Sequence, residues 1–415
     1  MTNPNQTGTS YLSRPATYKP RSVSYNRPPQ TYQPVVSTYK KRLPNRTRAR
    51  RIYRKKLSLL LPGHNEELII QATIRSAIAA GQNKEDIFVV DDCSSDETRQ
   101  KAIELLGKDQ VLTVERSGKA LAVYQAIKHF DIENRYLWLH VADSDSVFGE
   151  DYFKIYRRNL KGKKYAAAVG FVQSLRGNWI SKYRAFSYTY GQHLIRRMQS
   201  WVGMISVMPG PITCFRTDIL KELDFAAESL TEDFDITLQI HRKKLGKIKF
   251  IPGAVNYTQD PQTLADFCRQ TARWQRGFFQ GVVKYKLGSK RQMIDASIAY
   301  QMLQLVFYLF QILILVPFVI LATGRWTVIP FIILSDFVVL AWLALFSATV
   351  AKRVTILSAL PYFYFLRWLE LGIFLKAFVE VVILKRFRAE MRGWQTEGRR
   401  YALNAAALKD TAHEV

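Results

Sequence analysis

The sequence has few cysteines, no acidic residue in its first 65 positions and no long apolar run before residue 298. Its three cysteines, Cys93, Cys214 and Cys268, do not have the spacing of a metal-binding pair. So few thiols exclude a disulfide framework and a cysteine-ligated zinc site, and they indicate a reducing, cytosol-facing compartment. Without an early apolar run, we expect neither a cleavable signal peptide nor a membrane span near the start.

Positive charge dominates the stretch before Glu66, where 14 Lys and Arg residues occur, ten of them between Lys40 and Lys56. The whole chain has 60 Lys and Arg against 34 Asp and Glu, a formal net charge of +26. We expect residues 1–52 to be disordered, because a basic stretch with scattered prolines cannot bury enough apolar surface to fold. This tail has a tyrosine at every seventh position, each after Ser or Thr: Tyr11, Tyr18, Tyr25, Tyr32 and Tyr39. Its prolines exclude a coiled coil, so we expect a tether attracted to anionic lipid rather than to nucleic acid.

From residue 57 onward, short apolar strands alternate with helices. The expected strands are residues 57–61, 87–90, 111–114, 136–141 and 166–172. This alternation predicts an α/β fold with a doubly wound, mostly parallel sheet over residues 53–262. Such sheets bind ligands at the carboxyl ends of their strands, where Asp91-Asp92 and Asp143-Ser144-Asp145 follow two of the expected strands. The sequence therefore predicts a ligand site at that edge.

Three apolar stretches close the chain, and each is long enough to cross a hydrocarbon layer of ~30 Å. They cover residues 298–323, 326–351 and 356–384. The first two are expected to be spans. The third contains charged residues spaced for pairing on helix faces, Arg367 with Glu370 and Lys376 with Glu380. It is either a packed span or an interfacial helix, so we expect two or three spans in residues 298–384, followed by a basic tail, residues 385–415.

Two basic, aromatic segments, at about residues 176–201 and 263–290, are not apolar enough to cross a membrane. Helices of this composition are typical of the membrane–water interface. The alternative is that they pack on the soluble core.

Several polar residues can perform chemistry, although each also has a purely structural interpretation. Asp143 and Asp145 are two residues apart, so in an extended chain both side chains lie on one face. Such a pair can hold a divalent cation and leave positions for water and a diphosphate, or belong to a simple turn. Lys119 follows Gly118 at a helix start and can meet a phosphate beside backbone N–H groups, or be solvated.

Two later motifs are similarly open to both interpretations. Glu232 and Asp233 either act chemically or belong to the first turn of a helix, with Ser229 and Glu232 as a capping box. In the segment from Gln270 to Trp274, Arg273 can bind a diphosphate with two hydrogen bonds, and Trp274 offers a flat face to a sugar ring. The alternative for this segment is the polar face of an amphipathic helix.

In this order, the motifs resemble those of family-2 inverting glycosyltransferases, particularly the processive membrane group of cellulose, chitin, hyaluronan and poly-N-acetylglucosamine synthases. The resemblance covers residues 57–286. It implies a nucleotide-sugar-binding domain of the GT-A type on the cytosolic side of a multi-pass membrane protein. It also implies a UDP-sugar donor and Mg²⁺ or Mn²⁺ as cofactor.

The resemblance further implies a role for each matching residue. Pro62 and Glu66 lie in the family's first nucleotide-contacting turn, Asp91 and Asp92 in the step that contacts uracil, and Lys119 near the nucleotide. Asp143 and Asp145 match the metal and diphosphate site, and Asp233 matches the catalytic base. Gln270, Arg273 and Trp274 match the motif that holds the diphosphate and flanks the acceptor, and residues 209–216 match the loop beneath the acceptor sugar.

The function expected from this resemblance is transfer of a sugar, GlcNAc or glucose, to a growing β-linked polysaccharide. A single transfer to a lipid acceptor is the alternative within the same chemistry. A non-enzymatic membrane scaffold is the alternative from another class, but it gives no reason for so many placed carboxylates. The expected partners are the donor, a polysaccharide or lipid acceptor and membrane lipids, without nucleic acid.

Overall fold

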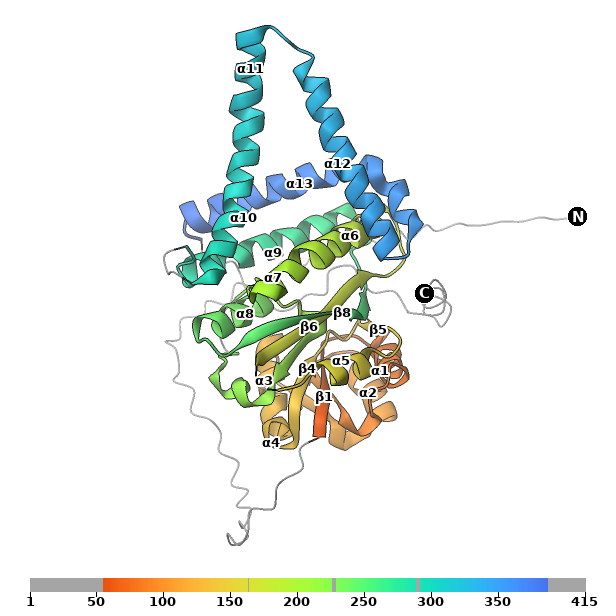
Figure 1. The fold of residues 1–415 in the computed structure, drawn as a ribbon. Coiled ribbons are helices and arrows are strands. Elements are labelled where there is room, and N and C mark those ends of the chain that lie inside the picture. The colour runs from red at the N-terminus through yellow and green to blue at the C-terminus, as the bar shows by residue number, and fades with distance from the viewer. Residues whose placement is uncertain (1–54, 163, 226–228, 289–291, 387–415) are drawn as a thin grey trace, which may run out of the picture. The chain divides into compact units, whose positions relative to one another are not determined.

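The computed structural model of the chain describes residues 55–386, apart from residues 163, 226–228 and 289–291. The predicted tail at residues 1–52 and the C-terminal tail from residue 387 onward lie outside the described residues. The described residues belong to one compact unit. Its described part has a sheet with helices on both faces, followed by a group of long helices (Figure 1). This arrangement confirms the predicted fold class.

All five predicted strands are present. They are β1 (Lys55–Gly63), β2 (Ile87–Asp92), β3 (Val111–Val114), β4 (Tyr136–Val141) and β6 (Tyr165–Ser174). Three strands that we did not predict complete the sheet: β5 (Val147–Phe148), β7 (Thr213–Arg216) and β8 (Lys247–Thr258). The strand order is β3-β2-β1-β4-β7-β6-β8-β5. The pairs β1–β2, β1–β4, β2–β3 and β6–β8 are parallel, whereas β7 runs antiparallel between β4 and β6, and β5 runs antiparallel to β8.

Alternate residues of β1 belong to two separate hydrophobic layers. Leu57, Leu59 and Leu61 pack on one face of the sheet, and Leu60 packs on the other. The first face is covered by α1 (Ile70–Ala79), α2 (Thr98–Leu106) and α5 (Tyr152–Asn159). The second is covered by α3 (Lys119–His129), α4 (Ile132–Arg135) and α8 (Glu232–Arg242). Both faces are buried, which explains why the strands are apolar runs.

The strand order reverses next to β1. Strands β2 and β3 follow on one side of β1, and β4 lies on its other side. In open α/β sheets, ligands bind outside the carboxyl ends of the strands at such a reversal. This position lies between the carboxyl ends of β1 and β4. Glu66 comes shortly after β1, and Asp143 comes shortly after β4.

Two amphipathic helices lie over this edge of the sheet. The first segment begins at α6 (Trp179–Tyr190), whose N-cap Asn178 accepts hydrogen bonds from the N–H groups of Ile180 and Ser181 at 3.0 and 3.3 Å. A π-helical turn, Gly191–Arg196, connects α6 to α7 (Arg197–Val202). The second helix is α9 (Leu264–Lys284), capped by the Thr263 side chain. Most of α6 is buried against α12 (Val328–Val350) and α13 (Leu360–Phe378).

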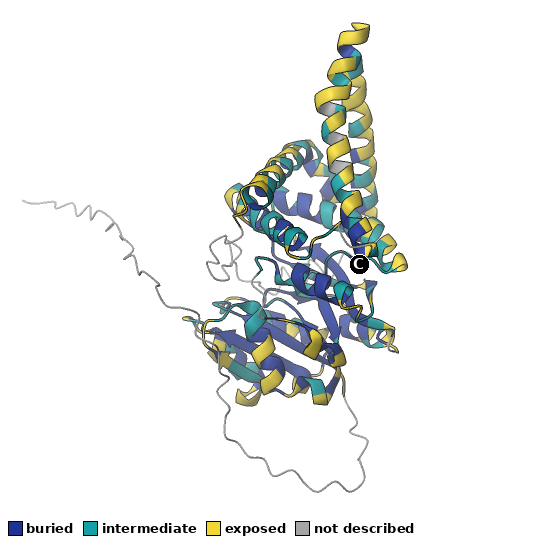
Figure 2. Cartoon of the chain, turned by 90° about the vertical axis from the view of Figure 1, so that its left-hand side faces the viewer, coloured by how far each residue is buried: buried dark blue, intermediate teal, exposed yellow. Residues whose placement is uncertain are grey.

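The apolar end of the chain forms helices with exposed side chains. Residues 298–323 are divided between α10 (Met293–Phe310), a π-helical turn, Gln311–Leu315, and α11 (Val316–Thr323). Among the described residues, α12 is the one helix long and apolar enough to cross a membrane, and Leu313–Thr323 is a shorter apolar helix. Figure 2 shows α11 and α12 with mostly exposed residues.

The third apolar stretch contains α13, which packs along α9 rather than beside α11 (Figure 1). The predicted contact of Lys376 with Glu380 is present, with 4.0 Å between Lys376 Nζ and Glu380 Oε1. Glu370 pairs with Arg184 of α6, because α6 packs directly against α13, and Arg367 pairs with Asp336 of α12 at 3.1 Å.

Candidate active site

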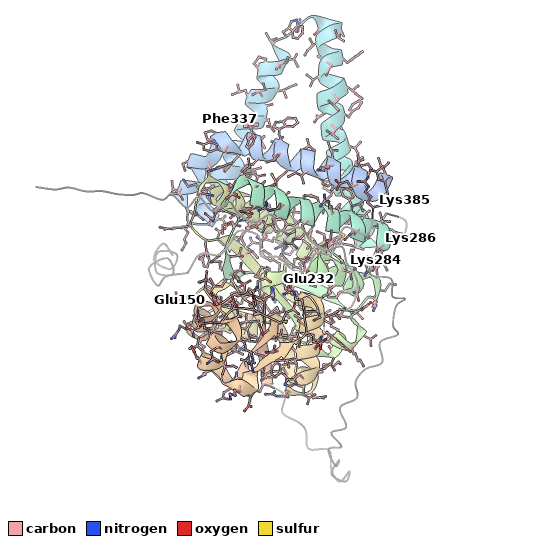
Figure 3. The ribbon with its side chains drawn as sticks, turned by 180° about the vertical axis from the view of Figure 1, so that it is seen from behind. Glu150, Glu232, Lys284, Lys286, Phe337 and Lys385 are labelled. Atoms are coloured by element: carbon pink, nitrogen blue, oxygen red, sulfur yellow. The ribbon has the colours of Figure 1, made fainter. Side chains whose placement is uncertain are left out.

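A cavity of about 2440 Å³ lies at the carboxyl ends of the parallel strands, beneath α7 and α9. Pockets for single small ligands typically have ~300–1,000 Å³, so this cavity has room for two substrates side by side. Figure 3 shows Glu232 between the sheet and the helices. Eight of the predicted site residues line it: Glu66, Lys119, Asp143, Asp145, Asp233, Gln270, Arg273 and Trp274.

Lys119 joins two acidic segments at the centre of the cavity. It is the first residue of α3, after Gly118 with a φ of 84°. Its Nζ lies 2.5 Å from Asp143 Oδ1 and 3.0 Å from Glu232 Oε1. Burial alone would lower the pKa of Lys119, but the carboxylates of Asp143 and Glu232 raise it above its ordinary value. Lys119 therefore stays protonated and brings the end of β4 and the start of α8 together.

Asp143 and Asp145 follow β4 and both face the cavity. A Cβ added to Gly210 would lie 2.6 Å from Lys119 Nζ and 3.5 Å from Asp143 Oδ1, so only a glycine leaves this space free. Among the described residues, no group of three or more His, Cys, Asp or Glu side chains is placed to hold a metal. Two carboxylates fit a cation that takes its other oxygen ligands from water and a substrate diphosphate, as Mg²⁺ prefers. The Lys119 ammonium beside Asp143 shows that this position favours positive charge.

Pro62, Asp91 and Asp92 lie next to the cavity but do not line it. The carbonyl of Pro62 accepts a hydrogen bond from the Ser144 hydroxyl. Asp92 is fully buried, and its carboxylate accepts hydrogen bonds from the N–H groups of Ser117 and Gly118 at 2.8 and 3.0 Å. In this structure, Asp92 therefore holds the loop that leads to Lys119.

Asp233 stands in the first turn of α8, which begins at Glu232. The alternative capping box with Ser229 is not formed, because the N-cap is Thr231 and Glu232 pairs with Lys119. Asp233 Oδ1 accepts a hydrogen bond from Phe234 N at 2.8 Å. Burial and the neighbouring Glu232 carboxylate raise the pKa of Asp233 to about 6, against the opposite effects of Lys119 and Arg273.

This raised pKa predicts a pH-dependent effect of Asp233→Asn on stability. The folded protein holds the Asp233 proton more tightly than the unfolded chain does, so ionising Asp233 opposes folding as the pH rises through about 6. We expect the melting temperature of the variant, relative to the parent, to be higher at pH 8 than at pH 5. Thermal unfolding in one detergent at both pH values measures this difference, and a difference independent of pH would contradict the prediction.

Gln270, Arg273 and Trp274 project from the middle of α9 into the cavity. Arg273 Nη1 donates to the carbonyl of Leu230, 3.4 Å away, just before α8. Arg184 of α6 donates from Nη2 to Gln270 Oε1 at 3.3 Å, and its guanidinium lies 4.8 Å from the centre of the Trp274 ring. The motif is therefore held from both sides, by Leu230 and by α6.

Two glycines allow α9 to approach α8 closely. A Cβ at Gly277 would lie 2.5 Å from Thr231 Cγ2, and closer still to its Oγ1. A Cβ at Gly281 would lie 2.5 Å from Cε1 of Phe234. Beyond them, Lys284 Nζ contacts a carboxylate oxygen of α8 at 2.6 Å. These contacts fix the helix of Asp233 against the helix of Arg273.

Sequence reasoning missed several residues at this site. Gly277 and Gly281 are one helical turn apart within an amphipathic helix, a spacing that signals close helix packing. Arg184 is one of several cations in the basic, aromatic segment at about residues 176–201, and nothing in the sequence distinguishes it from Arg196. Arg196 lines the cavity and donates to Gln192 Oε1 at 2.6 Å. The π-helical turn that places Arg196 there has no sequence signature of its own.

The chain matches the family described as "Glycosyltransferase like family 2" over residues 55–277, which is more than half of its length. The poly-beta-1,6-N-acetyl-D-glucosamine synthases of Staphylococcus aureus strain COL and Staphylococcus epidermidis are 25% and 26% identical to it, over 229 and 227 residues. Each alignment covers 53% of this chain and 54% of the relative. The chain thus spans about half the length of the curated relatives it matches.

Solved structures also resemble the chain. The mannosyltransferase PcManGT of Pyrobaculum calidifontis, in complex with GDP-Man and Mn²⁺, has a TM-score of 0.49 and 16% identity, over 74% of this chain and 86% of that chain. Glucosyl-3-phosphoglycerate synthase of Mycobacterium tuberculosis, in complex with Mg²⁺ and UDP, has a TM-score of 0.40 and 16% identity, over 56% and 79%.

Proposed function

The chain belongs to the glycosyltransferase-like family 2, and from this premise we propose that it transfers a hexosyl group from a UDP-sugar to a growing β-linked polysaccharide with inversion at the anomeric carbon. The observation that carries the proposal is the single cavity in which Lys119, Asp143, Asp233 and Arg273 converge. The similarity to poly-beta-1,6-N-acetyl-D-glucosamine synthases supports a polysaccharide product and makes GlcNAc the first sugar to test.

The donor diphosphate has a complementary part of the cavity. Lys119 and Arg273 provide positive charge there, and Arg273 offers paired N–H donors suited to phosphate oxygens. Asp143 and Asp145 would hold Mg²⁺ or Mn²⁺, which when bound supplies charge stabilisation to the leaving diphosphate. We assign Pro62, Glu66, Asp91 and Asp92 to the nucleotide side of the site, with Asp92 acting through the loop before Lys119.

Asp233 is the proposed general base. Asp233, with a pKa of about 6, is ionised at neutral pH. Because this pKa is raised, its carboxylate is more basic than an ordinary one and better able to accept the proton of an acceptor hydroxyl. That hydroxyl oxygen then attacks the anomeric carbon from the face opposite the diphosphate. Trp274 lines the same cavity and offers a ring face to the acceptor sugar, while Gln270 helps to hold the motif.

A lipid acceptor is a second candidate, because part of the cavity wall is apolar. Exposed side chains of α7 and α10 line it, including Met198, Val202, Met293 and Tyr300. A hydrocarbon chain would bury these side chains favourably. Product length separates the two candidates: a ladder of polymers indicates processive transfer, and a single added sugar indicates a lipid product.

We also propose that the protein is a multi-pass membrane protein. The exposed apolar side chains on α10, α11 and α12 form a surface far larger than isolated exposed residues, and such surfaces mark membrane or protein contacts. With α10–α11 and α12 as two crossings, and α13 lying at the interface beside α9, the basic residues Lys385 and Arg386 would be on the same side as the catalytic domain. This topology agrees with the positive-inside tendency.

The test of the proposed function is UDP release by the purified full-length protein in lipid nanodiscs. UDP-GlcNAc and UDP-glucose are supplied singly with Mg²⁺ or Mn²⁺, and products are sized afterwards. Release of UDP with incorporation of one sugar into product supports the proposal. No release with any UDP-sugar and acceptor would contradict it and favour a scaffold.

Removing divalent cations is expected to stop transfer. Without a bound cation, the carboxylates of Asp143 and Asp145 would repel the leaving diphosphate, so EDTA should reduce UDP release to background, and excess Mg²⁺ or Mn²⁺ should restore it. Asp145→Asn should raise the metal concentration needed for half-maximal rate. Activity that persists in EDTA after dialysis would contradict the metal assignment.

A further inference from the structure

Arg184 of α6 is a buried cation that contacts two other helices, α9 and α13. Its side chain is 4% exposed. From Nη2 it donates to Thr271 Oγ1 at 3.0 Å and to Gln270 Oε1 at 3.3 Å. Its guanidinium lies 4.3 Å from the ring centre of Phe267 and 4.8 Å from that of Trp274. One guanidinium therefore contacts four residues of α9, and two of these, Gln270 and Trp274, are named positions of the Gln-x-x-Arg-Trp motif.

The opposite edge of the same guanidinium is fixed by α13. Arg184 Nη1 lies 3.3 Å from Glu370 Oε1, and the hydroxyl of the neighbouring Tyr183 donates to Glu370 Oε2 at 2.6 Å. Glu370 is thus held through both carboxylate oxygens, and it holds Arg184 in turn. The link runs from α13 through α6 to the wall of the cavity formed by Trp274.

We propose that Arg184 is a positioning residue for acceptor binding, which sets the orientation of Trp274 and Gln270 and is itself oriented by Glu370. This inference rests on the proposed function and assigns a role that the family motifs do not contain. Arg184 is outside the residues that line the cavity, so it acts through α9 and not on the substrate. Donor binding involves Lys119 and Asp143, which lie on other elements, and Arg273, which is held separately by the carbonyl of Leu230. We therefore expect donor binding to depend on Arg184 much less than acceptor binding does.

The chemistry of the site requires arginine rather than any cation. A planar guanidinium can lie over two aromatic rings while it donates to an amide, a hydroxyl and a carboxylate in fixed directions. A lysine ammonium keeps the charge but cannot make these contacts together. Removing the charge entirely leaves Glu370 partly buried without its partner, which destabilises the fold by itself.

The experiment separates this positioning role from mere stability. Arg184→Gln, Arg184→Lys, Glu370→Gln and the double variant Arg184→Gln/Glu370→Gln are prepared in nanodiscs. KM is measured for UDP-GlcNAc and for a short β-1,6-linked GlcNAc oligosaccharide, together with melting temperature. Binding of the same oligosaccharide by calorimetry gives a readout that needs no turnover. Lys182→Gln, on the same helix and bonded to Ser358 Oγ at 2.7 Å, is the matched control.

We expect Arg184→Gln to raise the oligosaccharide KM and its dissociation constant by about tenfold or more, because small displacements of positioning groups are costly. The KM for UDP-GlcNAc should stay within about twofold. The double variant should recover melting temperature, since no unpaired carboxylate remains, without recovering oligosaccharide affinity. Arg184→Lys should have a melting temperature and an oligosaccharide affinity between those of Arg184→Gln and the parent. Lys182→Gln should behave like the parent.

Two results would overturn the inference while leaving the proposed function intact. One is an equal loss of donor and oligosaccharide affinity, and the other is full recovery of oligosaccharide affinity in the double variant. If the parent protein neither releases UDP nor binds the oligosaccharide, the proposed function fails and the inference fails with it.

Discussion

Asp233→Asn is expected to lower the rate of sugar transfer by about 10²–10⁴-fold, the usual contribution of a general base. The amide has nearly the shape of the carboxylate but cannot accept the acceptor proton. Lys119 and Arg273 remain in place, so UDP affinity should stay within about twofold. Transfer rates from product sizing and UDP affinity from calorimetry measure the two properties separately.

The parent enzyme should show a matching pH dependence. The proposed base must be ionised to act, and the pKa of Asp233 is raised to about 6. Transfer should therefore fall about tenfold per pH unit below 6 and level off above it. In Asp233→Asn this acidic limb should vanish from the residual rate.

Asp218→Asn is the control for this substitution. Asp218 is exposed, pairs with Arg216 Nε at 2.6 Å and does not line the cavity. It should leave transfer unchanged. If Asp233→Asn lost UDP binding but kept turnover, Asp233 would belong to the donor site instead.

Gly277→Ala is the second substitution with a large expected effect. The new methyl group would lie 2.5 Å from Thr231 Cγ2, a separation that packed atoms do not adopt, so α8 and α9 must move apart. Asp233 and Arg273 are carried on these two helices. We expect kcat/KM for transfer to fall by about 10²-fold, because catalysis is sensitive to displacements of about 1 Å, and the melting temperature to decrease.

Two further variants test the steric cause. Gly372→Ala on α13 is the matched control, since a Cβ there meets nothing within 4 Å, and it should keep both activity and stability. In the Gly277→Ala background, Thr231→Ala removes the two atoms nearest the new methyl and should restore part of the transfer rate. Normal activity of Gly277→Ala would show that the interface between α8 and α9 tolerates an extra methyl group.

Much of the fold could be predicted from the sequence because its strands are buried on both faces. The apolar runs that became β1, β2, β3, β4 and β6 are short and separated by helices, a pattern with few alternatives. The short strands β5 and β7 could not be predicted. Each gains its place from a partner far away in the chain, as β7 does from β4 and β6.

The candidate site was predictable to the extent that chemistry is carried by local motifs. The strand-end pattern predicts Asp143 and Asp145, and the resemblance to family-2 glycosyltransferases implies Asp233; all three line one cavity. The residues that hold these motifs were not predictable, because Arg184 and Gly277 act through contacts with segments that are distant in the sequence. Whether Asp91 or Asp92 contacts the nucleotide stays a prediction, since neither lines the cavity.

The close contact of Gly277 with Thr231, where α9 packs against the start of α8, has an evolutionary consequence. Thr231 lies just before α8, and Gly277 lies three residues after the segment from Gln270 to Trp274. A side-chain carbon at position 277 would occupy the volume that the Thr231 side chain fills. Natural variants should therefore change the two positions in concert, with a bulkier residue at 277 accompanied by a smaller one at 231. We expect the helices that carry Asp233, the proposed base, and Arg273, the proposed diphosphate ligand, to change together at this contact.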